Sequence, residues 1–320
     1  MKRFLPPFTL FTIIFAAPAA AFEAGLLPLG SYSASGYAMG NAVVALPARE
    51  SNVWTNPAGL AYQEGYLFYA APHDEVTGVT DDWRERVFAA NGLRGLGGVF
   101  GAALVLRQQQ NAAVGDPIVP ADIDEPTLLV GYGRRIGAKY AVGATVLGYR
   151  HRSDLDTLDG DITGGVTLGM LRVWDHVHRN DLPLQWRWAL ALQNFGPSFD
   201  VGTTKTDLPL ALRSGLSTRW EKEPGTSIVF SGDMHWLPRE EGNENPRIGG
   251  GVGGELKLSG VVAVRLGYLW DADSERADVT YGFGIGNEVY GNIGGMLEYA
   301  HAPGPVDFAD HIGLKVYWIP

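Results

Sequence analysis

Residues 185–194 read QWRWALALQN, in which large apolar residues alternate with polar or small ones. Successive side chains of a β-strand point to opposite faces, so residues two apart share a face. The large apolar residues therefore share one face, and the polar and small residues share the other. The apolar face carries Trp186, Trp188, Leu190 and Leu192, and the other face carries Gln185, Arg187, Ala189, Ala191 and Gln193. This alternation predicts a strand with one apolar and one polar face.

The same alternation recurs in residues 210–220, 261–270, 279–286 and 311–318. A soluble β-sandwich alternates too, but its outer face is polar and usually charged. Here the polar face is rich in Gly, Ala and Ser, which is typical of a crowded barrel interior. The apolar face often ends in an aromatic residue, as in the interfacial girdle of a membrane barrel. The aromatic ends are Trp220, Trp236, Trp270 and Trp318. The pattern favours an all-β transmembrane antiparallel β-barrel over a secreted sandwich.

We predict about fourteen strands, an even number that suits a single-chain bacterial barrel. They begin near Gly65, Arg86, Gly98, Pro126, Tyr140, Asp161, Gln185, Pro209, Ser227, Arg247, Val261, Val279, Ile293 and His311. Long and short connections alternate between them, as expected of outer loops and periplasmic turns. The connection 174–184 is long where a short turn is expected, which leaves the strand boundaries around it open.

Composition narrows the function. The chain has 320 residues, with 46% hydrophobic and 19% charged residues and no cysteine. The missing cysteine excludes disulfides, thiolate metal ligands and a nucleophilic thiol. The formal charge is −10 and no basic stripe is present, which argues against a nucleic-acid partner.

The N-terminus has the order of a secretory signal peptide. Lys2 and Arg3 precede an apolar run at 4–17, and Ala19–Ala21 offers small residues for cleavage. The alternative is a membrane anchor, which the prolines within the run and its short length disfavour. We therefore expect residues 1–21 to be a signal peptide that exports the chain to a Gram-negative type of outer membrane.

Residues 22–64 are predicted to form a small N-terminal plug, and residues 65–320 the barrel. The plug ends in Asn56, Pro57, Ala58, Gly59 and Leu60. Proline fixes its own φ and keeps the preceding residue out of the helical region, so this motif bends the chain. These five residues are candidates for a kinked, gating plug. The alternative, a turn that feeds the first strand, is favoured, since Pro and Gly mark turns in general.

Several charged residues share the polar face of the strands. A charge on the lipid face would cost about 2–4 kcal/mol at mid-depth, so this phase predicts that they face the barrel interior. They are Arg187, Arg213, Arg219, Asp233, Arg265, Glu298 and Lys315. They could line a polar passage, or pair with one another and with Arg49 and Glu50 of the plug. We favour the paired network, because a barrel of this size must fill its interior.

The sequence offers no catalytic constellation, so we expect no enzyme and no cofactor. His176 and His178 could share a strand face near Asp175 and Asp181. The segment reads as a turn, however, and a metal site normally needs three or four ligands. We therefore expect solvated turn residues and no metal.

Two motifs near the N-terminus carry a family resemblance. Ala38-Met39-Gly40-Asn41-Ala42 followed by Asn56-Pro57-Ala58-Gly59-Leu60 resembles the N-terminal motif of PorV/PorQ-type outer-membrane barrels. Further along, Leu208-Pro209-Leu210, Arg265-Leu266-Gly267-Tyr268 and the glycine-rich 281–286 resemble elements of the same family. A more distant resemblance is to FadL-type barrels.

The resemblance implies a non-enzymatic outer-membrane barrel that docks or exports secreted or surface proteins, as in type IX secretion. The FadL-like alternative is a passage for hydrophobic small molecules. The partners implied are outer-membrane lipid together with secreted or surface proteins or secretion-system components, or with hydrophobic small molecules.

Overall fold

The computed structural model describes residues 31–76, 82–114, 119–155, 159–174, 184–202, 204–238, 246–271, 276–290, 292–303 and 308–320. The predicted signal peptide and the first residues of the predicted plug lie outside these ranges. Within them, no helix combines the length and the apolar character that a membrane crossing would require.

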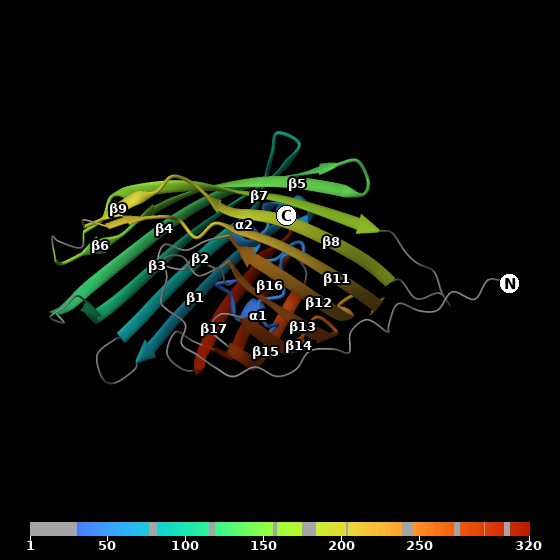
Figure 1. The fold of residues 1–320 in the computed structure, drawn as a ribbon. Helices are drawn as coiled ribbons and strands as arrows, with labels where there is room; N and C mark the ends of the chain where they lie inside the picture. The colour runs from blue at the N-terminus through green and yellow to red at the C-terminus, as the bar shows by residue number, and fades with distance from the viewer. Residues whose placement is uncertain are drawn as a thin grey trace.

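Fourteen long antiparallel strands form one sheet that closes on itself, because the first strand pairs with the last (Figure 1). They are β1 (Tyr66–Val76), β2 (Asp82–Gly95), β3 (Gly98–Val114), β4 (Val119–Ile136), β5 (Tyr140–Arg150), β7 (Ile162–Trp174), β8 (Leu184–Phe195), β11 (Ala211–Glu223), β12 (Thr226–Leu237), β13 (Arg247–Leu258), β14 (Val262–Asp271), β15 (Arg276–Tyr290), β16 (Ile293–Pro303) and β17 (Phe308–Trp318). The predicted fourteen-stranded barrel is confirmed, and a two-sheet sandwich is not formed.

The remaining elements are short. β6 (Arg152–Ser153) adds to β4, while β9 (Phe199–Val201) and β10 (Thr204–Thr206) form a separate two-stranded sheet between β8 and β11. From residue 31 onward, where the description begins, three short helices precede the barrel: α1 (Ala34–Tyr37), α2 (Asn52–Thr55) and the 3₁₀-helix η2 (Pro57–Tyr62).

Most strands begin within three residues of the predicted positions, and two begin clearly earlier. β2 starts at Asp82 rather than Arg86, and β4 starts at Val119 rather than Pro126. β3 and β4 continue together to the pair Val114–Val119, where a long loop was expected. The polar residues there read as a loop, but strands that reach beyond a lipid-facing band have no need of an apolar face.

The two ends of the barrel differ. One end, called here the short-turn end, carries the tight connections β2–β3, β4–β5, β11–β12, β13–β14 and β15–β16, and β1 begins there. In the β2–β3 turn Gly97 has a φ of +74°, a conformation that residues with a Cβ rarely adopt. The long connection that leaves β7 also starts at this end; β7 and β8 still pair directly, from Trp174–Trp186 onward.

The sides of the wall follow the predicted alternation. Val146, Phe230, Leu266 and Phe283 are exposed on the outer face. Their strand neighbours on the other face are buried, as Arg265 beside Leu266 illustrates. The outside of the barrel is thus apolar, and the charged residues are directed inward.

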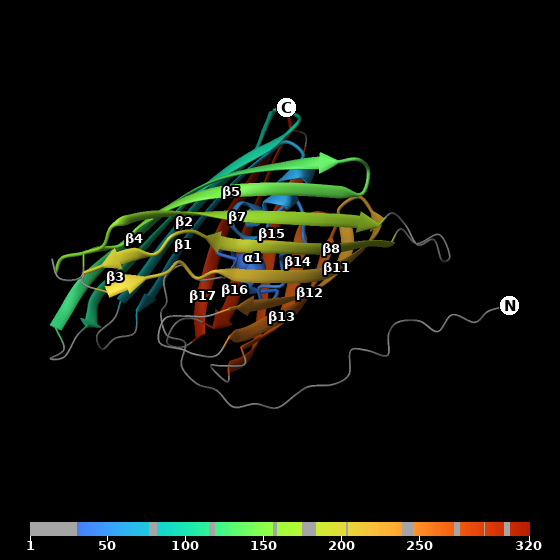
Figure 2. The ribbon, with the colours of Figure 1, turned by 45° about the horizontal axis from the view of Figure 1, so that its top comes forward.

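Residues 31–62, called here the interior segment, fill the space within the wall. Figure 1 shows its helices α1 and α2 surrounded by strands, and Figure 2 shows α1 within the wall from a second direction. η2 lies against β4, β5 and β7, and α1 lies against β15, β16 and β17, on the other side of the barrel. The segment therefore touches the wall on opposite sides.

Candidate functional site

Glycines in the wall allow the interior segment to come close to the backbone of the wall strands. A Cβ at Gly251 or Gly253 of β13 would overlap the backbone of Gly40 or Met39. A Cβ at Gly143 of β5 would overlap the backbone of Pro57. These inward glycines are where the wall and the segment pack most closely. The glycine-rich polar face of the strands thus serves close packing.

The five candidate plug residues lie together beside β4, β5 and β7. The Asn56 amide donates to the Val44 carbonyl at 2.8 Å and to the Met170 carbonyl of β7 at 3.3 Å. Its side-chain oxygen accepts from the Ala58 N–H at 3.1 Å and so caps η2, with Pro57 at the first helical position. Ala58, Gly59 and Leu60 are buried.

Gly59 is needed for space rather than for backbone conformation. Its φ is not positive, so the backbone conformation at this position is open to residues with a Cβ. A Cβ there would instead overlap the Asn52 side chain. The motif thus builds a capped 3₁₀-helix that leads through Gln63 into β1, and its gating role stays a prediction.

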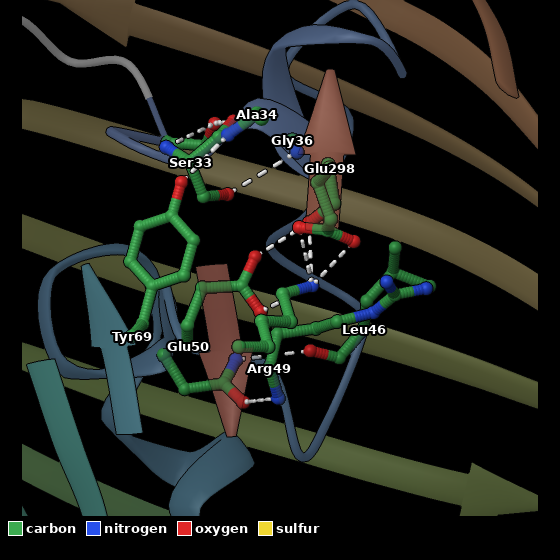
Figure 3. Close-up of polar contacts among 12 residues, drawn as sticks. Ser33, Ala34, Gly36, Leu46, Arg49, Glu50, Tyr69 and Glu298 are labelled. Carbon is green, nitrogen blue, oxygen red and sulfur yellow. Dashed lines mark hydrogen bonds and ion pairs between the residues drawn. The ribbon is translucent and has the colours of Figure 1, made fainter. Parts of the chain in front are cut away.

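A buried charge network joins the interior segment to the wall on the β13–β17 side (Figure 3). The Lys315 ammonium lies 2.8 Å from the Glu50 carboxylate and 2.9 Å from that of Glu298. Arg265 binds Glu298 at 2.8 Å and Glu255 at 2.6 Å, and Arg49 binds Glu255 at 2.7 Å. We call the six residues the central charge network: Arg49, Glu50, Glu255, Arg265, Glu298 and Lys315. Its three cations and three carboxylates balance, so little net charge is buried.

A second anchor lies on β11 and β12. The Asp233 carboxylate accepts from the backbone N–H groups of Val43 and Val44, both at 2.7 Å, and from Arg213 at 3.2 Å. Arg213 also donates to the Asn41 carbonyl at 2.9 Å. This charged pair therefore holds a turn of the interior segment through its main chain.

The last two predicted interior charges lie nearer the short-turn end and make local contacts. Arg187 is buried, and its Nε donates to the Gln185 side chain at 2.9 Å. Arg219 pairs with Glu221 at 3.1 Å, with both side chains more than one-third exposed. The structure thus brings five of the seven predicted charges into the two anchors and leaves these two outside them.

Sequence reasoning missed a row of polar residues on the inner face of β2–β5. Glu85 lies opposite Arg107, and Arg107 lies opposite Glu125, across neighbouring strands. Arg107 binds Glu125 at 3.1 Å and lies 3.8 Å from Glu85. The row could have been found by extending the alternation of each strand beyond its apolar part.

An apolar and aromatic cluster lies beside this row, between the interior segment and the wall. Its aromatic members, called here the aromatic cluster, are Tyr32, Trp54, Tyr69, Tyr149 and Phe199. Tyr32 meets Trp54 edge to face at 5.6 Å, and Tyr149 meets Phe199 in the same way at 5.5 Å. Wall residues such as Val87, Val105 and Leu147 complete it. The barrel interior therefore has an ion-paired side against β13–β17 and, on the β1–β5 side, an apolar cluster that adjoins the polar row.

Metal chemistry finds no support in the described ranges, which contain no group of three or more His, Asp or Glu side chains that could hold an ion. His176 and His178 lie outside those ranges.

No protein-family model matches the chain, and no curated protein matches its sequence. Solved structures do match. The toluene transporter TodX of Pseudomonas putida has a TM-score of 0.59 and 11% identity, over 91% of this chain and 98% of that one. The toluene transporter TbuX of Ralstonia pickettii has a TM-score of 0.57 and 13% identity, over 91% and 99%. A FadL homologue of Pseudomonas aeruginosa has a TM-score of 0.50 and 11% identity, over 94% and 99%.

The fold is that of FadL-type outer-membrane barrels. At these identities the likeness concerns the fold alone. The FadL-like resemblance, the more distant one in the sequence, is the one the structures support. None of the comparisons supports the resemblance to PorV/PorQ-type proteins.

Acid should release the interior segment only at very low pH. Burial raises the pKa of Glu50, but the charges of Lys315 and Arg49 outweigh it and bring the pKa down from 4.5 to about 2. A lowered pKa favours the docked state above pH 4.5, and this contribution is lost as the pH falls through about 2. The shift corresponds to about 3 kcal/mol.

We therefore expect pepsin to cut the interior segment at pH 2 but not at pH 4. In Glu50→Gln the group no longer titrates, so cleavage should change much less between these two pH values. Release of the wild-type segment between pH 5 and pH 7 would contradict this assignment.

Proposed function

We propose that this protein is an outer-membrane passage for small hydrophobic molecules. The observation that carries the proposal is the aromatic cluster inside a closed barrel, between the wall and the interior segment. An apolar, aromatic-lined region with few polar groups is the usual environment for an apolar ligand. The protein's likeness in fold to two toluene transporters also supports a small hydrophobic molecule as the ligand.

The outer surface supports a location in the membrane. Large apolar side chains such as Val146 and Leu266, exposed by 62% each, cover the outside of the strands. Aromatic pairs lie near the short-turn end, including Tyr66 stacked on Trp318 at 5.1 Å. An apolar band with aromatic rims is what a bilayer covers in an outer-membrane barrel.

The interior segment acts as the plug in this proposal. It is held by ion pairs on β13–β17, by Asp233 on β12, and by close backbone packing on β5. Molecules that cross the barrel must therefore pass between the plug and the wall, on the apolar side, or displace the plug.

A docking or export role for secreted proteins rests on the PorV/PorQ-like motifs alone. Native mass spectrometry of the protein, gently extracted from its own membrane, separates the two roles. We expect a bound hydrophobic small molecule and no stoichiometric protein partner. A stoichiometric partner protein without any enriched hydrophobic molecule would overturn the passage and favour docking.

A further inference from the structure

The two carboxylates in the polar row beside the aromatic cluster differ in the number of their hydrogen-bond partners. Glu125 is fully engaged, because its carboxylate accepts from the Tyr149 hydroxyl and from Arg107 at 3.1 Å, and contacts His151 Nδ1 at 3.2 Å. The Glu85 carboxylate has a single polar contact among the described residues, the ion pair with Arg107 at 3.8 Å. Since 3.8 Å exceeds hydrogen-bond distance, the Glu85 carboxylate keeps its accepting capacity.

The Tyr32 hydroxyl is the second group with unused hydrogen-bonding capacity. It is 4% exposed, and its hydroxyl has no hydrogen-bond partner in the part of the chain that the structure describes. A buried hydroxyl without a partner costs free energy, so such a group calls for an explanation. Burial raises the pKa of the Tyr32 hydroxyl, which therefore stays a neutral donor; Arg107, Glu85 and Glu125 lie near enough to act on it.

The backbone of Tyr32 is also unusual. Its φ is +49°, in the left-handed region that a bulky aromatic residue rarely adopts. Ser31, next to it, accepts from the Trp54 indole N–H and so fixes the chain at this point. A strained residue persists where the surroundings hold it, and such residues cluster at ligand sites.

We propose that the aromatic cluster binds a small apolar molecule that carries one uncharged hydroxyl group, a phenol or an alcohol. The ligand hydroxyl donates to the Glu85 carboxylate and accepts from the Tyr32 hydroxyl, while its apolar part packs among the aromatic rings. One hydroxyl can do both, because it is a donor and an acceptor at once. This inference rests on the proposed passage and names the substrate class.

The charges of the row also determine which ligands the site excludes. Two carboxylates, Glu85 and Glu125, face one guanidinium, Arg107, whose charge Glu125 already engages. A ligand carboxylate would add a third carboxylate beside Glu85 and Glu125 in a poorly solvated place, where like charges repel strongly. A plain hydrocarbon would match the apolar character of the rings but leave both polar groups without a hydrogen-bond partner.

The test compares three probes that share a methylphenyl ring and differ at the para position, namely toluene, p-cresol and p-toluate. Initial uptake rates are measured in intact Gram-negative cells that carry the wild-type barrel or an empty vector. The barrel is expected to take up p-cresol with a half-saturating concentration roughly tenfold lower than that of toluene, the effect of one added hydrogen-bonded group. Uptake of p-toluate should not exceed that of vector cells.

Variants then locate the preference. Tyr32→Phe and Glu85→Gln should each raise the half-saturating concentration for p-cresol severalfold and leave that for toluene unchanged. Tyr37→Phe, the same change elsewhere in the interior segment, should alter neither. Equal affinity for p-cresol and toluene in the wild type, or a preference for p-toluate, would overturn the inference while leaving the passage intact. If the wild-type barrel speeds the uptake of none of the three probes, the proposed passage itself fails.

Discussion

Replacing Glu298 by leucine is expected to lower the free energy of unfolding of the barrel by about 3 kcal/mol. Glu298 is fully buried and binds Arg265 and Lys315. Without it the central charge network has three cations and two carboxylates, so a buried positive charge loses its compensation. The loss is expected at the lower end of the cost of breaking a buried ion pair, because Glu50 still binds Lys315 and Glu255 still binds Arg265.

The measurement is a urea titration of the purified barrel, with the folded fraction read from its migration on a gel without heating. Glu221→Gln is the matched control. It also breaks an ion pair, but Glu221 and Arg219 are both well exposed, and exposed pairs contribute only about 0–1 kcal/mol. Equal urea midpoints for Glu298→Leu and Glu221→Gln would contradict the role of the network.

The second large effect is expected at Gly143. In Gly143→Val the new side chain would overlap the backbone of Pro57, which cannot rotate away as a flexible side chain could. Overpacking of this kind typically costs about 1–3 kcal/mol. We expect the barrel to assemble, since valine suits a strand, and η2 to leave its place on β5.

The measurement is limited proteolysis of the interior segment at neutral pH, which should become many times faster in Gly143→Val. Gly148→Val provides the control on the same strand, because no atom lies within 4 Å of a Cβ placed there. The opposite ordering, with Gly148→Val cut and Gly143→Val resistant, would show that the segment does not pack on β5 in this way.

The sequence predicted the wall well because the relevant signal is local. Trp186 and Arg187 are neighbours, and the two-residue period alone places them on opposite faces. It also placed Arg265, Glu298 and Lys315 on the inner face. The ion pairs of these residues needed the barrel, since Lys315 and Glu50 lie at opposite ends of the described chain.

The aromatic cluster could not be predicted from the sequence, because its members are also distant along the chain. Tyr32, Tyr149 and Phe199 come from three separate regions, and only the closing of the sheet brings them together. Glu85 lies just before the predicted strand start at Arg86, because the charged residues Asp81, Asp82 and Arg84 interrupt the apolar alternation there. In the structure Asp82, Arg84 and Glu85 belong to β2 and lie opposite β1 and β3.

The decisive measurement for the proposed passage is the rate at which intact Gram-negative cells take up labelled toluene through an outer membrane that contains the folded barrel. We expect cells carrying the protein to take up toluene severalfold faster than cells carrying an empty vector, with saturation at high concentration. Equal rates in the two strains, with the barrel shown to be folded in the outer membrane, would contradict the passage of hydrophobic molecules.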